Sequence, residues 1–331
     1  MSLLDKIPGE LQLYIGGLFT VRRKAQLQEA NITHILSVLR LPLDQELFEG
    51  FQHHVVEVDD VDDENLLEHF PETNKFIEDG LTSGGGVLVH CAMGKSRSAT
   101  CAIAYLMHRY KITPTEALEQ IRQSRPLCEP NEGFMKQLEL YHEMQMPIDI
   151  AGNTIYQRWL YQREVEMSRA CGQAPEAEKI RFEDEHVSDK EEGGFTLKCK
   201  KCRGSLATSQ FILPHSPLVS HRRFQPIDNV ASAAQTSPDC AHYFVDPLSW
   251  MRPELELGKL DGRLECPKCK TNVGKYAWQG MRCSCGEWVI PAITLAKARI
   301  DEFKAIKARP GQMGIRMPPG MATRGPGGEN L

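Results

Sequence analysis

The segment GGGVLVHCAMGKSRSAT, residues 84–100, places an apolar run directly before a glycine-containing turn and that turn directly before an amphipathic stretch. Val87, Leu88 and Val89 are typical of a buried strand, whereas residues 96–110 carry apolar side chains at helical spacing. The sequence therefore predicts a strand ending near Cys91, a tight loop, and a helix with one buried face.

Residues 1–148 alternate short β-like runs with amphipathic segments of helical length. The β-like runs are THILSV, HVVEV and GVLVHC, and the predicted helices are 96–110, 114–124 and 134–144. This alternation predicts an α/β fold in which helices flank a central sheet.

The length of 331 residues suggests two folded units with connecting segments. We expect the α/β domain at 1–148 and a helical and acidic linker at 149–195, with its helix at 154–170. Paired cysteines and short β-like pieces predict a small β-rich zinc-binding domain at 196–303. The Gly-, Pro- and Met-rich tail at 304–331 is predicted to be disordered.

The composition excludes several classes of protein. A net charge of −5 with 25% charged residues argues against a strongly acidic disordered chain and against a nucleic-acid binder driven by overall charge. Asp5 and Glu10 interrupt any secretory signal, and no apolar run reaches membrane-spanning length. We therefore expect an intracellular protein that does not insert in a membrane.

The loop after the predicted strand has the chemistry of an anion site. Backbone N–H groups of Ala92, Met93, Gly94, Lys95 and Ser96 and the following helix N-terminus would bind phosphate oxygens. Arg97 can hold two of these oxygens in a planar fork, and the same field lowers the pKa of the Cys91 thiol.

A thiolate beneath a bound phosphate ester can attack phosphorus and form a phosphocysteine. We assign Cys91 as the nucleophile, Ser98 as hydrogen-bond donor to the leaving sulfur, and His90 as a residue that orients the loop. The leaving oxygen needs an acid, which the run EVDDVDDE at 57–64 supplies. Asp60 is preferred because it follows the strand, and Asp59 is the alternative.

The neighbouring Asp62 or Asp63 could instead cap the following helix.

The pattern HC-x-x-G-x-x-R-S resembles the signature of the cysteine-dependent phosphatases, and its setting resembles their dual-specificity branch. IPGELQLYIGG, THILSV, FPETNKFIEDG and RP-x-x-x-PN-x-GF-x-x-QL agree in order and spacing over about residues 7–142. The resemblance implies a protein-tyrosine phosphatase of dual specificity, a phosphoric monoester hydrolase. By this resemblance Cys91 is the nucleophile and Arg97 is the phosphate clamp. Ser98 is the leaving-group helper, and Asp60 is the general acid. Met93 stands where an alanine is common.

Seven of the eleven cysteines lie between Cys199 and Cys285, in the pairs KCKKC, ECPKC and RCSCG with Cys240 between the first two. Two tetrahedral zinc ions need eight ligands. Seven cysteines and one histidine complete that number, and His215 is preferred over His242. Both sites would be closed and structural.

Residues 196–295 resemble the C-terminal domain of the zinc-tailed dual-specificity phosphatases of the ribosome-assembly (Yvh-type) subfamily. Similarity of the C-x-x-C knuckles to the Mss-four type zinc fold implies that one ion binds Cys199, Cys202, Cys266 and Cys269. The other would bind His215, Cys240, Cys283 and Cys285.

The resemblance also implies the cellular role. It predicts phosphoprotein substrates, action in biogenesis of the large (60S) ribosomal subunit, and localisation in nucleus and cytoplasm. The partner would be the pre-60S particle, with its ribosomal proteins and rRNA near the stalk base. The alternative is an assembly factor that releases a placeholder protein and does not need the phosphatase activity.

Overall fold

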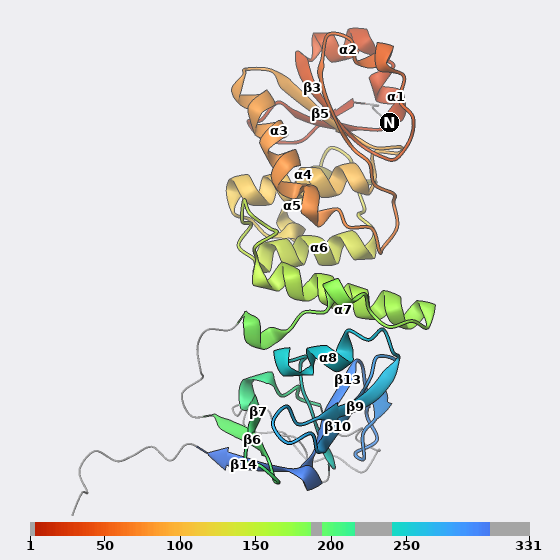
Figure 1. The fold of residues 1–331 in the computed structure, drawn as a ribbon. Helices are drawn as coiled ribbons and strands as arrows, with labels where there is room; N and C mark the ends of the chain where they lie inside the picture. Colours follow the sequence, from red (N-terminus) through yellow and green to blue (C-terminus); the bar gives the residue numbers. More distant parts are fainter. Residues whose placement is uncertain (1–3, 187–193, 216–239, 305–331) are drawn as a thin grey trace, which may run out of the picture. The chain divides into compact units, whose positions relative to one another are not determined.

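The computed structural model describes residues 4–186, 194–215 and 240–304 (Figure 1). It divides into two compact units, residues 1–167 and 168–331, and each is described by itself. Residues 187–193 of the predicted linker and 305–331 of the predicted tail lie outside the described residues.

A five-stranded sheet forms the centre of the first unit, in the order β1-β2-β5-β3-β4. The edge strand β1 pairs antiparallel with β2, and the other neighbours are parallel. The strands are β1 (Leu4–Lys6), β2 (Leu13–Gly16), β3 (Ile32–Val38), β4 (Gln52–Val56) and β5 (Gly86–His90). Parallel strands need crossover connections, which accounts for the alternation of strands and helices in the sequence.

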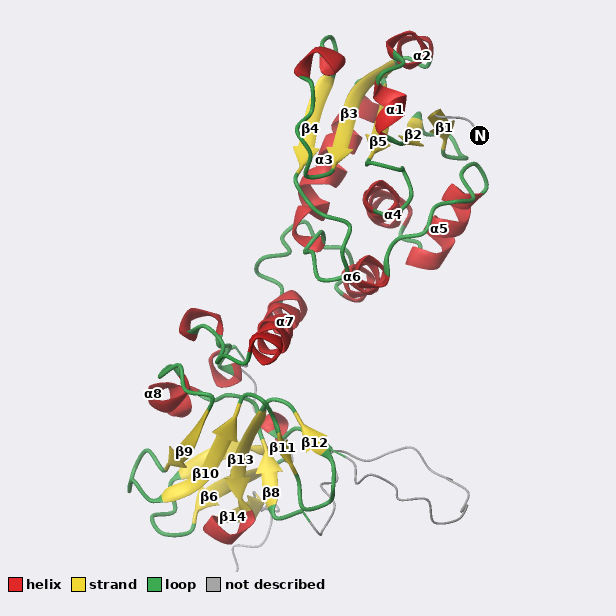
Figure 2. Cartoon of the chain, turned by 90° about the vertical axis from the view of Figure 1, so that its right-hand side faces the viewer, coloured by secondary structure: helices red, strands yellow, loops and turns green. Residues whose placement is uncertain are grey.

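Helices cover both faces of this sheet (Figure 2). The larger core lies on one face, where Phe70, Ile103 and Leu138 from three helices pack together. On the other face Val21, Leu27 and other side chains form a smaller core. The helices are α1 (Leu18–Val21), α2 (Lys24–Glu29), α3 (Phe70–Thr82), α4 (Arg97–Tyr110), α5 (Pro114–Arg122), α6 (Glu132–Glu143) and α7 (Thr154–Cys171), with short 3-10 turns at Gln45–Phe48 and Leu67–His69. The predicted α/β fold is confirmed.

The helix boundaries follow local sequence signals. Thr113 caps α5 through a capping box with Glu116, and Pro114 occupies the first helical position. The Asn131 side chain accepts the N–H of Phe134 and so caps α6. These helices begin within two residues of the predicted positions.

The strand predicted at 54–58 instead ends at Val56. Val58 is buried, and its carbonyl oxygen accepts a hydrogen bond from Nη1 of Arg97 instead of a strand partner. The predicted helix cap at Asp62 or Asp63 is wrong, because α3 begins after His69 without a side-chain cap. Asp62 accepts the N–H of Gly133 instead.

Two helices anchor the loop between β4 and α3. Gln137 of α6 accepts the N–H groups of Leu66 and Leu67 and donates to the Glu64 carbonyl. From α7, Tyr156 accepts a hydrogen bond from Asn65. Because α6 and α7 follow α4 in the chain, the acidic loop is held by segments remote from it in sequence.

Antiparallel strands make up most of the second unit, which confirms a β-rich second region. One sheet has the order β8-β13-β10-β9, a second β14-β6-β7, and a third pairs β11 with β12. The strands are β6 (Phe195–Cys199), β7 (Ser205–Thr208), β8 (His242–Phe244), β9 (Asp261–Glu265), β10 (Asn272–Ala277), β11 (Met281–Arg282), β12 (Trp288–Val289), β13 (Ala292–Ala296) and β14 (Ile300–Lys304), with the short helix α8 (Arg252–Leu255).

The segment predicted to be a linker has buried residues in both of its halves. Ile150 and Tyr156 belong to the large core of the first unit. Phe182 is buried, and the N–H of Glu183 donates to the Pro247 carbonyl within the second unit. The division between the units falls inside α7.

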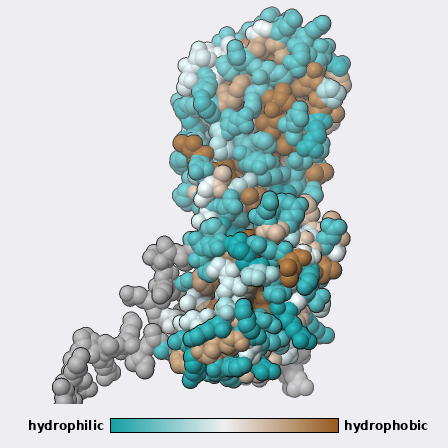
Figure 3. Space-filling view, viewed as in Figure 1, coloured by the Kyte–Doolittle hydropathy of each residue, from teal (hydrophilic) through white to brown (hydrophobic). Residues whose placement is uncertain are grey.

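The visible surface is mostly hydrophilic, with apolar patches that are most extensive over the first unit (Figure 3). No described helix is both long enough and apolar enough to cross a lipid bilayer.

Candidate functional site

Cys91 follows β5 and begins a loop that turns directly into α4. Its Sγ accepts hydrogen bonds from the Gly94 N–H at 3.2 Å and from the Ser98 hydroxyl at 3.3 Å. Gly94 has a positive φ of 68°, and a Cβ there would lie 2.3 Å from the Gly16 carbonyl oxygen. Only glycine allows the loop to curl this tightly against β2.

The environment of Cys91 favours its thiolate. Burial opposes ionisation and is the largest single influence on the pKa. Hydrogen bonds from the Ser98 hydroxyl and from the backbone N–H groups of Ser98, Lys95 and Gly94 act in the other direction, and the pKa is lowered below its ordinary value. The sulfur is therefore stabilised as an anion by donors from its own loop and the first turn of α4.

Arg97 is buried at the start of α4, beside the cysteine loop. Its Nη1 donates to the Val58 carbonyl at 3.1 Å, and its Nε lies 3.6 Å from Oδ2 of Asp60. Nε makes no hydrogen bond within the described part of the chain. A buried guanidinium with an open donor is suited to receive an anion such as phosphate.

Asp60 is held at the same loop by two donors. Its Oδ1 accepts the Ser96 hydroxyl at 2.6 Å and Nδ2 of Asn131 at 3.1 Å. Asp59, the alternative acid, instead pairs with Arg40 at 2.7 Å. The structure therefore brings Asp60 to the cysteine loop and directs Asp59 to a different partner.

His90 belongs to a buried chain of hydrogen bonds. Its Nδ1 lies 3.3 Å from the Cys91 carbonyl oxygen, which can only accept, so Nδ1 carries the proton. Nε2 of the neutral ring then accepts from the Ser37 hydroxyl at 2.6 Å, and the Ser37 oxygen accepts from Nε2 of His53 at 2.8 Å. Burial lowers the pKa of His90 to about 4, so the ring is neutral and orients the loop.

The remaining loop residues contribute mainly backbone. The Ala92 carbonyl accepts the Leu18 N–H, and the Lys95 side chain pairs with Glu129 at 2.7 Å. Met93 is exposed. Ser96 differs from the prediction that it offers mainly its N–H, because its hydroxyl also contacts Asp60 and accepts the Asn131 N–H.

One group of four cysteines forms where two hairpins face each other in the second unit. Cys199 ends β6 and Cys202 lies between β6 and β7, whereas Cys266 and Cys269 lie between β9 and β10. Sulfur atoms of Cys199 and Cys269 are 3.8 Å apart, and those of Cys202 and Cys266 are 3.5 Å apart. A tetrahedron with Zn–S bonds of about 2.3 Å has edges of about 3.8 Å, so the set fits zinc.

The second group comprises His215, Cys240, Cys283 and Cys285, with all ligand atoms within 4.8 Å of one another. Nε2 of His215 lies 3.2 Å from the sulfurs of both Cys240 and Cys283. His242, the alternative ligand, belongs to β8 and to neither group of candidate metal ligands. Both groups could hold a metal ion, and their chemistry is consistent with zinc.

Known proteins are similar to this chain over one unit or over both. Residues 13–144 match the family model for the dual specificity phosphatase catalytic domain. Tyrosine-protein phosphatase yvh1 of Schizosaccharomyces pombe is 34% identical, with 92% of this chain and 87% of the relative covered. The chain belongs to the Yvh1-type dual-specificity phosphatases.

Two further comparisons describe the extent of similarity. Dual specificity protein phosphatase 12 of Homo sapiens is 33% identical over 95% of this chain and 92% of its own length. A solved Yvh1 phosphatase domain from Chaetomium thermophilum is 40% identical, covers 44% of this chain and 99% of that chain, and gives a TM-score of 0.42. In this Yvh1-type phosphatase the enzymatic activity is that of a dual-specificity protein-tyrosine phosphatase.

Arg125 supports the cysteine loop of the phosphatase and was not predicted as a site residue. It is buried, donates to the carbonyls of Met93 and Gly94, and pairs with Asp5 at 2.6 Å. The sequence signal was the RP-x-x-x-PN run, which contains both Arg125 and Asn131. Neither role is readable from that run, because both partners lie far away in sequence.

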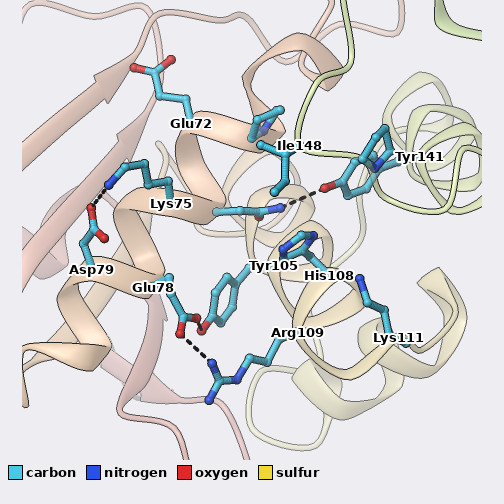
Figure 4. A pocket seen from close by; sticks show the side chains of 13 residues that line it. Glu72, Lys75, Glu78, Asp79, Tyr105, His108, Arg109, Lys111, Tyr141 and Ile148 are labelled. Atoms are coloured by element: carbon cyan, nitrogen blue, oxygen red, sulfur yellow. Dashed lines mark hydrogen bonds and ion pairs between the residues drawn. The ribbon is translucent and has the colours of Figure 1, made fainter. Parts of the chain in front are cut away.

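The phosphatase unit has a separate hollow of about 800 Å³ between α3 and α4 that contains none of the predicted site residues. Figure 4 shows Glu78 directed toward Tyr105 and Arg109, to which it hydrogen-bonds, while Lys75 pairs with Asp79. No cysteine, serine or threonine lies among its lining residues.

Proposed function

We propose that this phosphatase hydrolyses phosphotyrosine and phosphoserine or phosphothreonine in proteins through a phosphocysteine intermediate. The observation that carries the proposal is the Cys91 sulfur, which receives hydrogen bonds from Ser98 and Gly94 while the adjacent buried Arg97 has an open donor. An anion bound by Arg97 and the loop amides would lie directly over the thiolate.

In the first step the Cys91 thiolate attacks phosphorus, an S–P bond forms, and the P–O bond to the substrate breaks. The leaving oxygen takes a proton from Asp60, which Ser96 and Asn131 hold beside the loop. The loop amides and Arg97 stabilise the charge on the transferring phosphoryl oxygens.

In the second step water attacks phosphorus and the S–P bond breaks. Asp60, now a carboxylate, accepts a proton from that water, and the Ser98 hydroxyl stabilises the departing thiolate. His90 takes no proton in either step, since it remains neutral and holds the Cys91 carbonyl.

Rapid acid quenching of the full chain with a phosphotyrosyl peptide tests the intermediate. Mass spectrometry should find one added phosphoryl group on the peptide that contains Cys91, and none in Cys91→Ser. Turnover by Cys91→Ser at the wild-type rate would refute the mechanism.

We propose further that each metal group binds one structural zinc ion. Four ligands complete each set and leave no position for a reacting water. Bound zinc would supply cross-links between hairpins and take no part in phosphate hydrolysis.

We infer a second function for the zinc unit, in biogenesis of the large ribosomal subunit within nucleus and cytoplasm. Two observations support it. Similarity to the yvh1 relative extends over both units, so more than the catalytic domain is shared. In addition, Lys198, Lys200, Lys201 and Arg203 lie in and beside the first C-x-x-C turn, where they would suit contact with rRNA phosphates.

In this reading the pre-60S particle near the stalk base is the partner, and release of a placeholder protein does not need catalysis. Sedimentation of tagged protein from cells separates the two functions. The Cys266→Ser protein should no longer sediment with the pre-60S particles, whereas the Cys91→Ser protein should still sediment with them. Equal loss of both variants would contradict a role of the zinc unit that is independent of catalysis.

A further inference from the structure

An apolar groove of about 660 Å³ borders the cysteine loop of the phosphatase unit. Its apolar walls include Phe19 of α1, Met93 of the loop itself, and Pro126 and Leu127 of the segment between α5 and α6. The volume lies within the range of roughly 300–1,000 Å³ that is usual for ligand sites. The groove is therefore large enough to hold a side chain of a bound peptide.

The apolar side chains at this groove are unusually exposed. Phe19 is 65% exposed and Met93 73% exposed, and Leu127 is half-buried. The Arg22 guanidinium lies 5.5 Å from the centre of the Phe19 ring and leaves most of that side chain accessible. Large exposed apolar side chains that adjoin a reactive site mark a contact surface.

The groove adjoins the reaction centre. Lys95 and Glu129, joined at 2.7 Å, line both this groove and a smaller hollow that contains Asp60, Ser96 and Asn131. Ala92 and Met93 form part of the groove wall and directly follow the nucleophile. A peptide whose phosphorylated residue reaches Cys91 must therefore pass beside the groove.

We propose that this groove binds a large apolar side chain, such as leucine, methionine or phenylalanine, that neighbours the phosphorylated residue of a protein substrate. The inference rests on the proposed function, because it assigns a substrate class to the same site. Its occupant follows from the position of the groove beside Cys91 and from the apolar side chains of Phe19, Met93 and Leu127. A polar peptide would leave those side chains in water.

The test uses the full chain and matched phosphotyrosyl peptides. At each position flanking the phosphotyrosine, one peptide carries leucine, one serine and one aspartate. We expect kcat/KM to be higher for leucine than for serine by roughly 10-fold or more at one flank. The double variant Phe19→Ala, Leu127→Ala should reduce that ratio to about 2-fold or less, with the loss of apolar contact.

Hydrolysis of para-nitrophenyl phosphate, which has no peptide flanks, provides an internal reference. It should be unchanged in the double variant, which also verifies that the variant is folded. Ile148→Ala removes a more exposed apolar side chain from the hollow between α3 and α4 and should preserve the leucine preference.

Equal kcat/KM for leucine and serine peptides, or a leucine preference that survives the double variant, would overturn the proposal. A preference for aspartate would also overturn it, since that result would assign the specificity to Lys95, Arg22 and Arg122. Failure of the proposed function is a different outcome, in which wild-type protein does not hydrolyse para-nitrophenyl phosphate at all.

Discussion

Cys91 of the first unit and Cys240 of the second are both buried, yet their pKa values move in opposite directions. The pKa of Cys91 is lowered, because hydrogen-bond donors of Ser98, Lys95 and Gly94 outweigh its burial. Burial and hydrogen bonds with Cys283 and Cys285 raise the pKa of Cys240 to about 12. A thiolate in the first unit is stabilised by the protein alone. In each cysteine group of the second unit one thiol has a raised pKa, Cys202 or Cys240, and another a lowered pKa, Cys269 or Cys283, so a complete set of thiolates would need a metal ion.

The second unit also differs from the first in that candidate metal ligands take part in its apolar packing. The first unit packs a continuous apolar cluster against each face of its sheet. In the second unit Cys240 and Cys283 themselves belong to a small cluster with Phe244 and Ala292. We therefore expect the phosphatase unit to fold without metal and the zinc unit to depend on it.

Metal removal should have the largest effect, because it should unfold the second unit and leave the first unit folded. Structural zinc contributes about 10–16 kcal/mol in small domains, so a chelator that removes both ions should unfold much of the second unit, and Cys266→Ser at the first group should destabilise it. The measured metal content should fall from two ions per chain to one in Cys266→Ser. Hydrolysis of para-nitrophenyl phosphate should persist. Loss of this activity together with the metal would contradict the expectation that the phosphatase unit folds without metal.

Cys91→Ser should produce the converse result. Loss of the nucleophile should lower kcat by about 10⁴–10⁶-fold, as for other nucleophiles in covalent catalysis. Metal content and the unfolding of the second unit should not change. Cys171→Ser, which replaces an exposed thiol, is the matched control and should retain full activity.

Asp60→Asn should slow leaving-group departure by about 10²–10⁴-fold. The loss should be greatest for alkyl phosphates, whose poor leaving groups need a proton, and small for para-nitrophenyl phosphate. Asp59→Asn serves as the control because Asp59 pairs with Arg40 away from the cysteine loop. Similar losses in both variants would remove Asp60 from the mechanism.

Ser98→Ala sharpens the contrast between the thiols, since it removes one of the donors that lower the pKa of Cys91. Alkylation of Cys91 by iodoacetamide rises with the thiolate fraction as pH increases. The midpoint of that rise should lie below the pKa of a free thiol in wild type and should move to higher pH in Ser98→Ala. Identical midpoints would show that the hydroxyl does not stabilise the thiolate.

Asn131→Ala should have the smallest effect and tests how remote segments hold the acid. Loss of the α6 cap should cost about 1 kcal/mol in the free energy of unfolding. Thr113→Ala removes a comparable cap from α5 and should cost about the same. Only Asn131→Ala should also lower kcat, by roughly 10-fold, because it releases Asp60. Equal kcat in the two variants would contradict this positioning role.

The sequence predicted the cysteine loop well because its parts are contiguous. The strand, the turn and the first helical turn of α4 lie within residues 86–98, so local propensity and glycine at position 94 define most of the geometry. Arg125 was missed because its partner Asp5 lies 120 residues away. The end of β4 was misplaced because the Val58 carbonyl binds Arg97 rather than a strand.

The sequence by itself determined which residues carry chemistry: a cysteine and an arginine six positions apart, and paired thiols at C-x-x-C spacing. Only the tertiary structure decided which aspartate reaches the cysteine loop, which histidine joins Cys240, and how the thiols divide into two groups. The physical reason is that side-chain type and local backbone are encoded over a few residues, whereas those groupings depend on contacts between distant strands and helices.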